Sequence, residues 1–303
     1  MTYGPQPQTN EIFLDHIAHW LAHADAAQLA LQQLGFTTTP FSEQRQTDAD
    51  GNIVPAGSGN YCVMLERGYL EFLVPLADTV IGRELKAGIE RYVGVHIAAF
   101  ACAQASDQHA FMQKLGFHQR PLAKLSREVL DQHDTLAVAQ FDVARPRPGV
   151  IAEGRVQFLT HHTPELLWQP RYVHHANGAQ ALTGLTFAVS DLAEAVARYQ
   201  RILQRAGVQI SGGHVFALEH GALTLLDYEA AVSRFGSALV PSAPSMVNYQ
   251  LECDCAKAFV KYVEPHAEVH AYGPNAFLVT LPAALGASII ITKKGLSAYG
   301  LMK

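Results

Sequence analysis

The stretch Leu14-Asp15-His16-Ile17-Ala18-His19-Trp20 has a counterpart further along the chain, Val93-Gly94-Val95-His96-Ile97-Ala98-Ala99. Each stretch places a histidine inside a short apolar run. Each is followed by a helical stretch and then by nearly the same four residues, Gln33-Leu34-Gly35-Phe36 and Lys114-Leu115-Gly116-Phe117. The glycine lies 19 residues after the histidine in the first copy and 20 in the second. This spacing indicates a repeated strand–helix unit.

Each unit is predicted to hold one strand, one helix and three further strands. In the first unit we expect a strand over 12–22, a helix over 26–34 with Asp25 as its N-cap, a second strand at 37–39, turns at 48–52 and 56–60, and a hairpin over 61–74. The second unit runs from 92 to about 159. Weaker copies begin at 182 and 247, without a histidine at the position of His16 or His96.

Four such units should pair two by two, because one small sheet cannot cover its own apolar face. The sequence therefore predicts an α+β fold with two domains. We place the first domain at 10–162 and the second at 181–303, joined by a linker at 163–180 that is rich in turn residues.

The bulk composition points to small-molecule partners. The 303 residues carry a net charge of −5 without a basic block, which argues against binding to nucleic acid or to an anionic membrane. No apolar run approaches the roughly 18 residues of a membrane helix, and the polar N-terminus lacks the pattern of a secretion signal. The four cysteines form no Cys-x-x-Cys pair. We therefore expect a cytoplasmic protein.

Alternation along the strands predicts which side chains share a face of the first sheet. Tyr69 and Glu71 project the same way, and so do Arg155 and Gln157 in the second unit. Aligning Tyr-Leu-Glu-Phe-Leu with Arg-Val-Gln-Phe-Leu makes Glu71 and Gln157 equivalent. Both units thus carry a polar residue on the first strand and another on the last.

These polar residues suggest a metal site. If the sheet curls into a cup, His16, Glu71, His96 and Gln157 converge, and this donor mixture suits Zn, Fe(II), Ni or Mn. The alternative for a histidine in a strand is a hydrogen-bonded core residue. Gln157 is the weakest member, because glutamine is an uncommon ligand, and its alternative role is a hydrogen bond to a metal-bound water.

Further candidates stand around this predicted cup. Proton transfer is assigned to Glu71 or to the histidine pair His161 and His162, whose alternative is a solvated loop. Substrate binding is assigned to side chains in phase with the ligands and to two in the linker, with a salt bridge and linker packing as the alternatives: Tyr69, Arg155, Glu165 and Trp168.

The units resemble the βαβββ modules of the vicinal-oxygen-chelate superfamily, which includes glyoxalase I and the extradiol dioxygenases. The resemblance rests on Leu14-Asp15-His16-Ile17, on Leu-Gly-Phe after the helix and on Gly68-Tyr69-Leu70-Glu71. The segment 163–168, with 177–184 and 189–191, is similar to the glyoxalase-like domain proteins in particular. The resemblance covers residues 12 to about 230.

The resemblance implies metal ligands at His16, Glu71, His96 and Gln157, although a carboxylate is usual where this chain has Gln157. It implies a metal-dependent lyase or isomerase that stabilises an enolate formed from an oxygen-chelating substrate. One alternative is an extradiol ring-cleavage dioxygenase, although in those enzymes the metal is expected in the C-terminal pair. The other is a metal-free binding or resistance protein, and the C-terminal pair is also a candidate homodimer surface.

Overall fold

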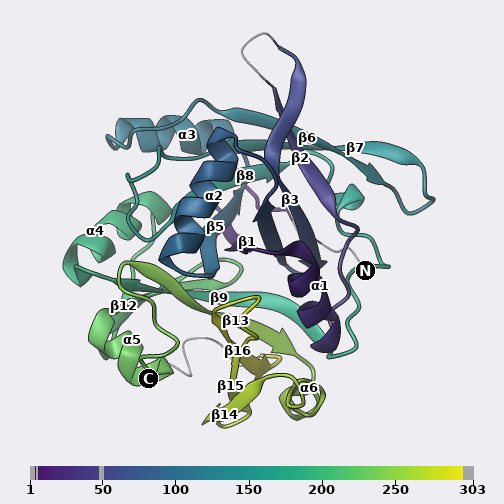
Figure 1. Ribbon diagram of the computed structural model, residues 1–303. Coiled ribbons are helices and arrows are strands. Elements are labelled where there is room, and N and C mark those ends of the chain that lie inside the picture. Colours follow the sequence, from purple (N-terminus) through teal and green to yellow (C-terminus); the bar gives the residue numbers. More distant parts are fainter. Residues whose placement is uncertain (1–3, 5, 48–50, 296–303) are drawn as a thin grey trace.

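The computed structural model describes residue 4 and the ranges 6–47 and 51–295. Residues 1–3 and 5 of the polar N-terminus and residues 48–50 of the predicted turn lie outside this description. The described chain forms two eight-stranded sheets with helices around them (Figure 1).

The first sheet has the strand order β2-β3-β4-β1-β5-β8-β7-β6. Its first unit consists of β1 (Ile12–Trp20), α1 (Ala24–Gln33), β2 (Ser42–Thr47), β3 (Ile53–Met64) and β4 (Tyr69–Pro75). Helix α2 (Val80–Arg91) leads to the second unit, which consists of β5 (Gly94–Cys102), α3 (Ala105–Lys114), β6 (Ala123–Leu130), β7 (Leu136–Ala144) and β8 (Arg155–His161).

The second sheet repeats this order as β10-β11-β12-β9-β13-β16-β15-β14. After the short helix η1 (Pro164–Leu166), its first unit consists of β9 (Ala179–Val189), α4 (Leu192–Leu203), β10 (Val208–Ile210), β11 (Gly213–Ala217) and β12 (Ala222–Asp227). Helix α5 (Tyr228–Phe235) then precedes β13 (Ser245–Cys253), α6 (Ala256–Val263), β14 (Glu268–Gly273), β15 (Ala276–Thr280) and β16 (Ser288–Lys293).

The predicted fold class is confirmed. Each sheet joins two βαβββ units through their first strands, which pair antiparallel as β1 with β5 and as β9 with β13. Within a unit, the last strand lies parallel to the first. The domain boundaries at 162 and 181 stay a prediction.

The Leu-Gly-Phe sequence that marks the units ends their helices. Gly35 and Gly116 have φ angles of 79° and 85°, a left-handed conformation that glycine adopts without strain. The Phe36 and Phe117 N–H groups donate to the carbonyls five residues earlier, at 2.9 and 3.0 Å. These contacts, with those of the two glycine N–H groups, make Schellman caps that satisfy the last carbonyls of α1 and α3.

Several local predictions in the first unit are wrong. Asp25 lies inside α1, whose N-cap is His23. The second strand is at Ser42–Thr47 rather than at 37–39, because Thr37 instead bonds the linker, donating its hydroxyl to the His174 carbonyl at 2.7 Å. Residues 56–60, predicted as a turn, belong to β3.

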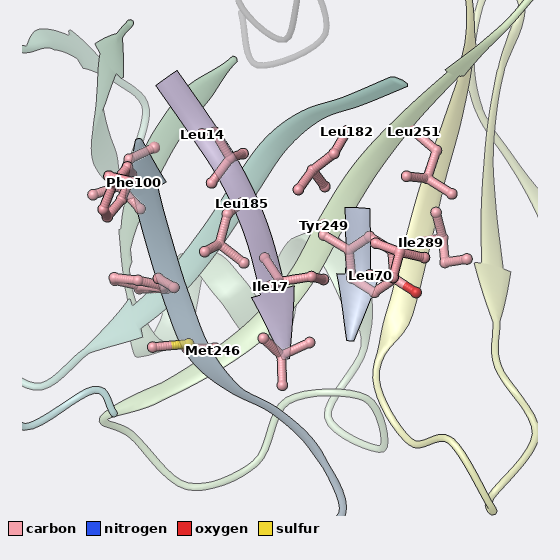
Figure 2. Packing of buried hydrophobic residues seen from close by; sticks show 14 of the residues in the cluster. Leu14, Ile17, Leu70, Phe100, Leu182, Leu185, Met246, Tyr249, Leu251 and Ile289 are labelled. Atoms are coloured by element: carbon pink, nitrogen blue, oxygen red, sulfur yellow. The ribbon is translucent and has the colours of Figure 1, made fainter. Parts of the chain in front are cut away.

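The two sheets pack against each other through their apolar faces. One cluster of buried residues draws side chains from both sheets, among them Leu14, Ile17 and Phe100 from the first and Leu185 and Tyr249 from the second (Figure 2). Helices α1, α3, α4 and α6 add side chains to the same cluster. Burial of this shared apolar surface is the main force that holds the two sheets together.

The opposite faces of the sheets therefore point away from the shared core. In the first sheet the edge strands β2 and β6 contact each other, so the sheet curls into a nearly closed cup. Helix α2, which the sequence analysis did not predict, covers one end of this cup. Its Leu85 packs in a buried cluster with Trp20 and Ile97. Among the described residues, no helix combines the length and apolar character needed to cross a membrane.

Candidate functional site

A cavity of about 160 Å³ lies in the cup of the first sheet. Strands β1, β4, β5 and β8 contribute side chains on the concave face, and β2, β6 and β7 supply the rest of the strand lining. The lining includes five of the sequence-predicted site residues and three further arginines: His16, Tyr69, Glu71, Arg155 and Gln157, with Arg45, Arg127 and Arg145.

A β-bulge shapes the β1 side of this cavity. Leu14 pairs with Phe100 and His16 with Ala99, so Asp15 is an extra residue without a partner on β5. A bulge re-aims the side chains beside it. As a result, the neighbouring side chains of Asp15 and His16 bond each other, although strict alternation would place them on opposite faces.

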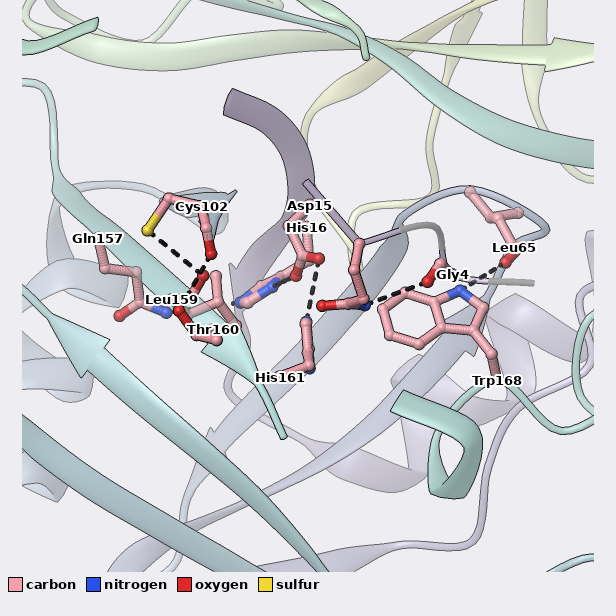
Figure 3. A network of polar contacts seen from close by, with 11 residues as sticks. Gly4, Asp15, His16, Leu65, Cys102, Gln157, Leu159, Thr160, His161 and Trp168 are labelled. Carbon is pink, nitrogen blue, oxygen red and sulfur yellow. Dashed lines mark hydrogen bonds and ion pairs between the residues drawn. The ribbon is translucent and has the colours of Figure 1, made fainter. Parts of the chain in front are cut away.

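Asp15 connects two imidazoles in a buried network (Figure 3). Its Oδ2 lies 2.7 Å from Nδ1 of His16, and its Oδ1 lies 3.0 Å from Nε2 of His161. Burial alone would raise the pKa of Asp15, but His161 and His16 together hold it well below its usual range. Because an ionised carboxylate only accepts hydrogen bonds, both facing nitrogens carry hydrogens.

The network presents Nε2 of His16 toward the cavity. With the hydrogen held on Nδ1, the neutral imidazole has its lone pair on Nε2. The Gln157 side-chain nitrogen lies 3.5 Å from this atom, and the Tyr69 ring stacks on the imidazole with 4.3 Å between centroids. His16 is only 3% exposed, so its orientation is fixed on every side.

Glu71 lies on the adjacent strand β4 and is held by amides. Its Oε1 accepts hydrogen bonds from the Asn60 side chain and, at 3.2 Å, from that of Gln44. Ser58 in turn donates to the side-chain oxygen Oε1 of Gln44 at 2.8 Å. The carboxylate is thus fixed at the wall of the cavity, and within the described part of the chain its Oε2 makes no hydrogen bond.

His96 does not join these residues. A second bulge leaves it between Val95 and Ile97, which pair with His19 and Ala18. Its ring is stacked between Trp20 and Tyr92, at 4.7 and 4.0 Å, and its Nε2 lies 2.8 Å from the Tyr92 carbonyl. Burial lowers the pKa of His96 to about 4.

The four-ligand metal set expected from the sequence does not fit this geometry. His16, Glu71 and Gln157 line the cavity. His96 lines a separate cavity, and its Nε2 hydrogen-bonds the Tyr92 carbonyl. Within the ranges that the structure describes, no group of three or more His, Cys, Asp and Glu side chains is placed to hold a metal ion.

Tyr69 and Arg155, expected to bind substrate, both line the cavity. Burial raises the pKa of Tyr69 well above its ordinary value, as do the nearby Asp15 and Glu71, so the phenol keeps its hydrogen. Arg155 donates to Glu84 of α2 at 2.6 Å and lies over the Trp20 ring, 5.2 Å from its centroid.

The other candidates occupy different environments. His161 is buried beside Asp15, whereas His162 is exposed and lies 3.4 Å from the Asp142 carboxylate. Trp168 is buried; its indole N–H donates to the Leu65 carbonyl at 3.0 Å, and its ring meets His161 edge-on. Glu165 is an exposed residue of η1. Neither Trp168 nor Glu165 lines the cavity.

The sequence analysis missed several residues of the site. Asp15 was visible beside His16, but strict alternation placed it on the other face. Arg127 of β6 lines the cavity, and its charge acts on Tyr69 and Glu71. The sequence signal for Arg127 was its place in the alternation of Ala123, Leu125 and Val129, on the face that the structure leaves half-buried.

Comparisons with known proteins agree with this architecture. The sequence profile of the family described as a glyoxalase-like domain matches residues 14–203, well over half of the chain. No curated protein matches the sequence.

Several solved structures share the fold. A hypothetical protein from Staphylococcus aureus has a TM-score of 0.64 at 10% identity, over 93% of this chain and 99% of that one. A mutant of 4-hydroxymandelate synthase from Streptomyces coelicolor has a TM-score of 0.55 at 10% identity, over 96% and 97%. The Mn(II)-bound glyoxalase from Novosphingobium aromaticivorans has a TM-score of 0.54 at 9% identity, over 95% and 83%. With a family profile across both units of the first sheet and this shared fold, the chain belongs to the glyoxalase-like domain family of the vicinal-oxygen-chelate superfamily.

Proposed function

We propose that this protein is an enzyme that moves a proton on a small, oxygen-bearing substrate in the first cup, with His16 as the base. The observation that carries the proposal is the buried Asp15–His16 pair, with 2.7 Å between Oδ2 and Nδ1. A carboxylate bound to one imidazole nitrogen fixes the tautomer and favours the protonated ring that forms when the other nitrogen takes a proton. The other nitrogen of His16, Nε2, lies 3.5 Å from the Gln157 side-chain nitrogen at the wall of the cavity.

The other side chains of the cavity suit a carbonyl substrate. The step we propose is removal by Nε2 of a proton from the carbon beside a carbonyl, with the electron pair of that C–H bond moving to the carbonyl oxygen. The Tyr69 hydroxyl and the Arg127 and Arg155 guanidiniums are the donors available for the enolate oxygen. In an α-hydroxy carbonyl substrate, return of the proton to the former carbonyl carbon, with the hydroxyl proton passing to the enolate oxygen, gives an isomerase. Loss of a leaving group from the carbon next to the deprotonated one, with the carbonyl re-formed, gives a lyase.

Metal binding is the second candidate for His16, and one observation favours it. A metal-bound histidine commonly donates its other N–H to a carboxylate, which is the arrangement that Asp15 makes. Glu71 would be the second ligand of such an ion. The set that would hold it is smaller than the sequence implied, because His96 is engaged elsewhere.

Solvent exchange tests the proposal without knowledge of the natural substrate. We would incubate the protein with a panel of 2-oxo acids and hydroxyketones in D₂O and follow deuterium incorporation by NMR. His16→Ala should lower the exchange rate by about 10²–10⁴, the usual contribution of a general base. His23→Ala, at an exposed position, is the matched control. Equal rates in wild type and His16→Ala would refute the base role.

Metal analysis separates the two roles of His16. One equivalent of metal in the wild type, lost in both His16→Ala and Glu71→Ala, would make His16 a ligand rather than a base. Oxygen uptake with a catechol would reveal ring cleavage instead of proton transfer. Stoichiometric ligand binding with neither exchange nor turnover would favour a binding protein.

A further inference from the structure

A second cavity, of about 320 Å³, lies between α2 and the loop that joins β7 to β8. Trp20 and His96, stacked on each other, form part of its wall. Its charges are strongly unbalanced: Glu84 is the only acidic side chain of the lining, whereas five arginines contribute to it, namely Arg91, Arg120, Arg145, Arg147 and Arg155.

The single carboxylate is already engaged. Glu84 forms ion pairs with Arg120 and, at 2.6 Å, with Arg155. Arg91 donates to the Pro244 carbonyl at 2.8 Å, and Arg147 donates to the Gln119 carbonyl at 3.4 Å. No acidic side chain of the lining is left for the remaining positive charge.

Arg145 is the most exceptional of the five. Its guanidinium makes no hydrogen bond or ion pair within the described ranges, and its Nε is buried. Burial, with the nearby Arg155 and Arg120, lowers the pKa of Arg145 to about 10, so it is still charged at neutral pH. The charge of Glu84 partly opposes this shift, but Glu84 is ion-paired to Arg120 and Arg155. A partly desolvated cation without an ion pair of its own is costly to fold. That cost is offset when an anion occupies the cavity.

We infer that this cavity binds the phosphate group of a small molecule, with Arg145 as its main contact. Guanidinium groups bind phosphate oxygens through paired N–H···O hydrogen bonds. A phosphate dianion also balances the excess charge of the lining better than one carboxylate would. The observations that carry the inference are the five arginines, the single engaged glutamate and the unpartnered Arg145.

The position of this cavity connects it with the cup. Arg145 and Arg155 line both cavities, so they form part of the wall between them. A phosphate held there lies beside the substrate cavity, and the rest of the same molecule would reach toward His16. This extension, to a phosphorylated carbonyl substrate, rests on the proposed function, whereas phosphate binding alone does not.

Titration with inorganic phosphate at constant ionic strength, with chloride as the balancing anion, tests the site directly. Trp20 lines the cavity, so its fluorescence reports occupancy, and the rise in Tm gives a second readout. Arg145→Gln should weaken phosphate binding by about tenfold or more, as expected for loss of a charge-assisted hydrogen bond. Arg83→Gln is the matched control, because Arg83 lies on α2, is largely exposed and does not line the cavity.

The outcomes separate this inference from the proposed function. Without phosphate, Arg145→Gln should be at least as stable as the wild type, since it removes an unpaired buried charge. His16→Ala should bind phosphate as the wild type does, even where deuterium exchange is lost. Absence of saturable binding to the wild type, equal affinity in Arg145→Gln, or tighter binding of a dicarboxylate than of phosphate would each overturn the inference.

Discussion

The cup of the first sheet is lined by imidazole, carboxylate and guanidinium groups around a cavity, whereas the cup of the second sheet is filled by a helix. In the second sheet Phe235 and Ala231 of α5 pack on Ala188, Leu226 and Ile290. The strand orders of the two sheets are the same. Strand topology therefore does not decide which sheet holds a site.

The register shows where the two cups diverge. His16 of β1 lies beside Tyr69 of β4, and in the second sheet Thr186 of β9 lies beside Thr224 of β12. Helices α2 and α5 follow the last strand of equivalent units, yet α2 packs at one end of its cup, around Trp20. In the second sheet, small side chains lie under α5, which fills the cup. In the first sheet, larger polar side chains line the cup and α2 lies at its end, so a cavity remains.

The largest expected effect comes from removing the aromatic side chain of Phe235, which fills the second cup. Phe235→Ala should lower the free energy of unfolding by about 3–5 kcal/mol, because it leaves a void in a packed cluster. Phe141→Ala in the first cup is the matched control, and it should cost about 1–2 kcal/mol less, since Phe141 already borders a cavity. Urea denaturation measures both; equal losses would mean that the cups are packed alike.

The contact between the two sheets should respond to pH through His19. This residue is fully buried, bonds the Leu285 carbonyl at 2.8 Å and has a pKa lowered to about 4 by burial. The folded state thus holds fewer protons than the unfolded chain, so stability falls as pH drops from about 6.5 toward 4, by about 3 kcal/mol from this group.

His19→Gln keeps a donor for the Leu285 carbonyl but does not titrate. Urea denaturation across this pH range should show a shallower slope for His19→Gln than for the wild type, while the exposed His23→Gln keeps the wild-type slope. His96, His175 and His220 also have pKa values lowered to about 4 by burial, so only the difference between variants isolates His19. Identical slopes would show that His19 is not the group that titrates.

In the first sheet, Asp15→Asn tests the charge of the buried Asp15 carboxylate. At pH 7 the variant should lose about 1.5–3 kcal/mol, the usual contribution of hydrogen bonds to a charged group. Because folding lowers the pKa of Asp15, its contribution is present above the unfolded pKa of about 3.9 and disappears as pH falls through the folded value.

The difference between Asp15→Asn and wild type should therefore narrow in acid, as measured by urea denaturation at pH 7 and pH 3. Asp142→Asn, which loses only the contact with the exposed His162, should cost less than about 1 kcal/mol. A constant difference between the two pH values would place the role of Asp15 in packing rather than in charge.

The smallest effect concerns the caps that the units share. Gly116→Ala should cost about 1 kcal/mol for the left-handed backbone, because a Cβ there meets nothing within 4 Å. In Gly35→Ala the new Cβ would lie 2.4 Å from the ring of Tyr262, a half-exposed side chain of α6, so this variant should cost slightly more. Thermal unfolding distinguishes the two variants. A smaller loss of stability in Gly35→Ala than in Gly116→Ala would contradict the close approach of Gly35 to Tyr262.

Much of the architecture could be predicted from the sequence because local signals repeat. The phrase at Gln33–Phe36 returns at Lys114–Phe117, and both end a helix with the same cap. Apolar runs marked the first strands of the first three units, and the alternating stretch Val247-Asn248-Tyr249-Gln250-Leu251 marked that of the fourth. Helices α2 and α5 were missed because the repeated unit was predicted without them, although Thr79 and Asp227 cap their N-termini.

The site was less predictable, because alternation fails at a bulge. His16 and His96 are equivalent in sequence, but the extra residue is Asp15 in β1 and His96 itself in β5. The bulge in β1 therefore places the Asp15 carboxylate beside His16. The bulge in β5 places the His96 ring between the rings of Trp20 and Tyr92. The position of a bulge depends on how two strands pair, which neither strand encodes alone.

The apolar cluster behind the cups has a practical meaning for protein engineering. Leu14 and Phe100 of the first sheet pack in one cluster with Leu185 and Tyr249 of the second. Either half alone would expose this apolar surface to water. The second half covers apolar surface of the first half that water would otherwise contact. Strand positions of the first sheet that face the cavity can then be varied to change its chemistry. Positions of the same strands that face the second sheet must stay apolar.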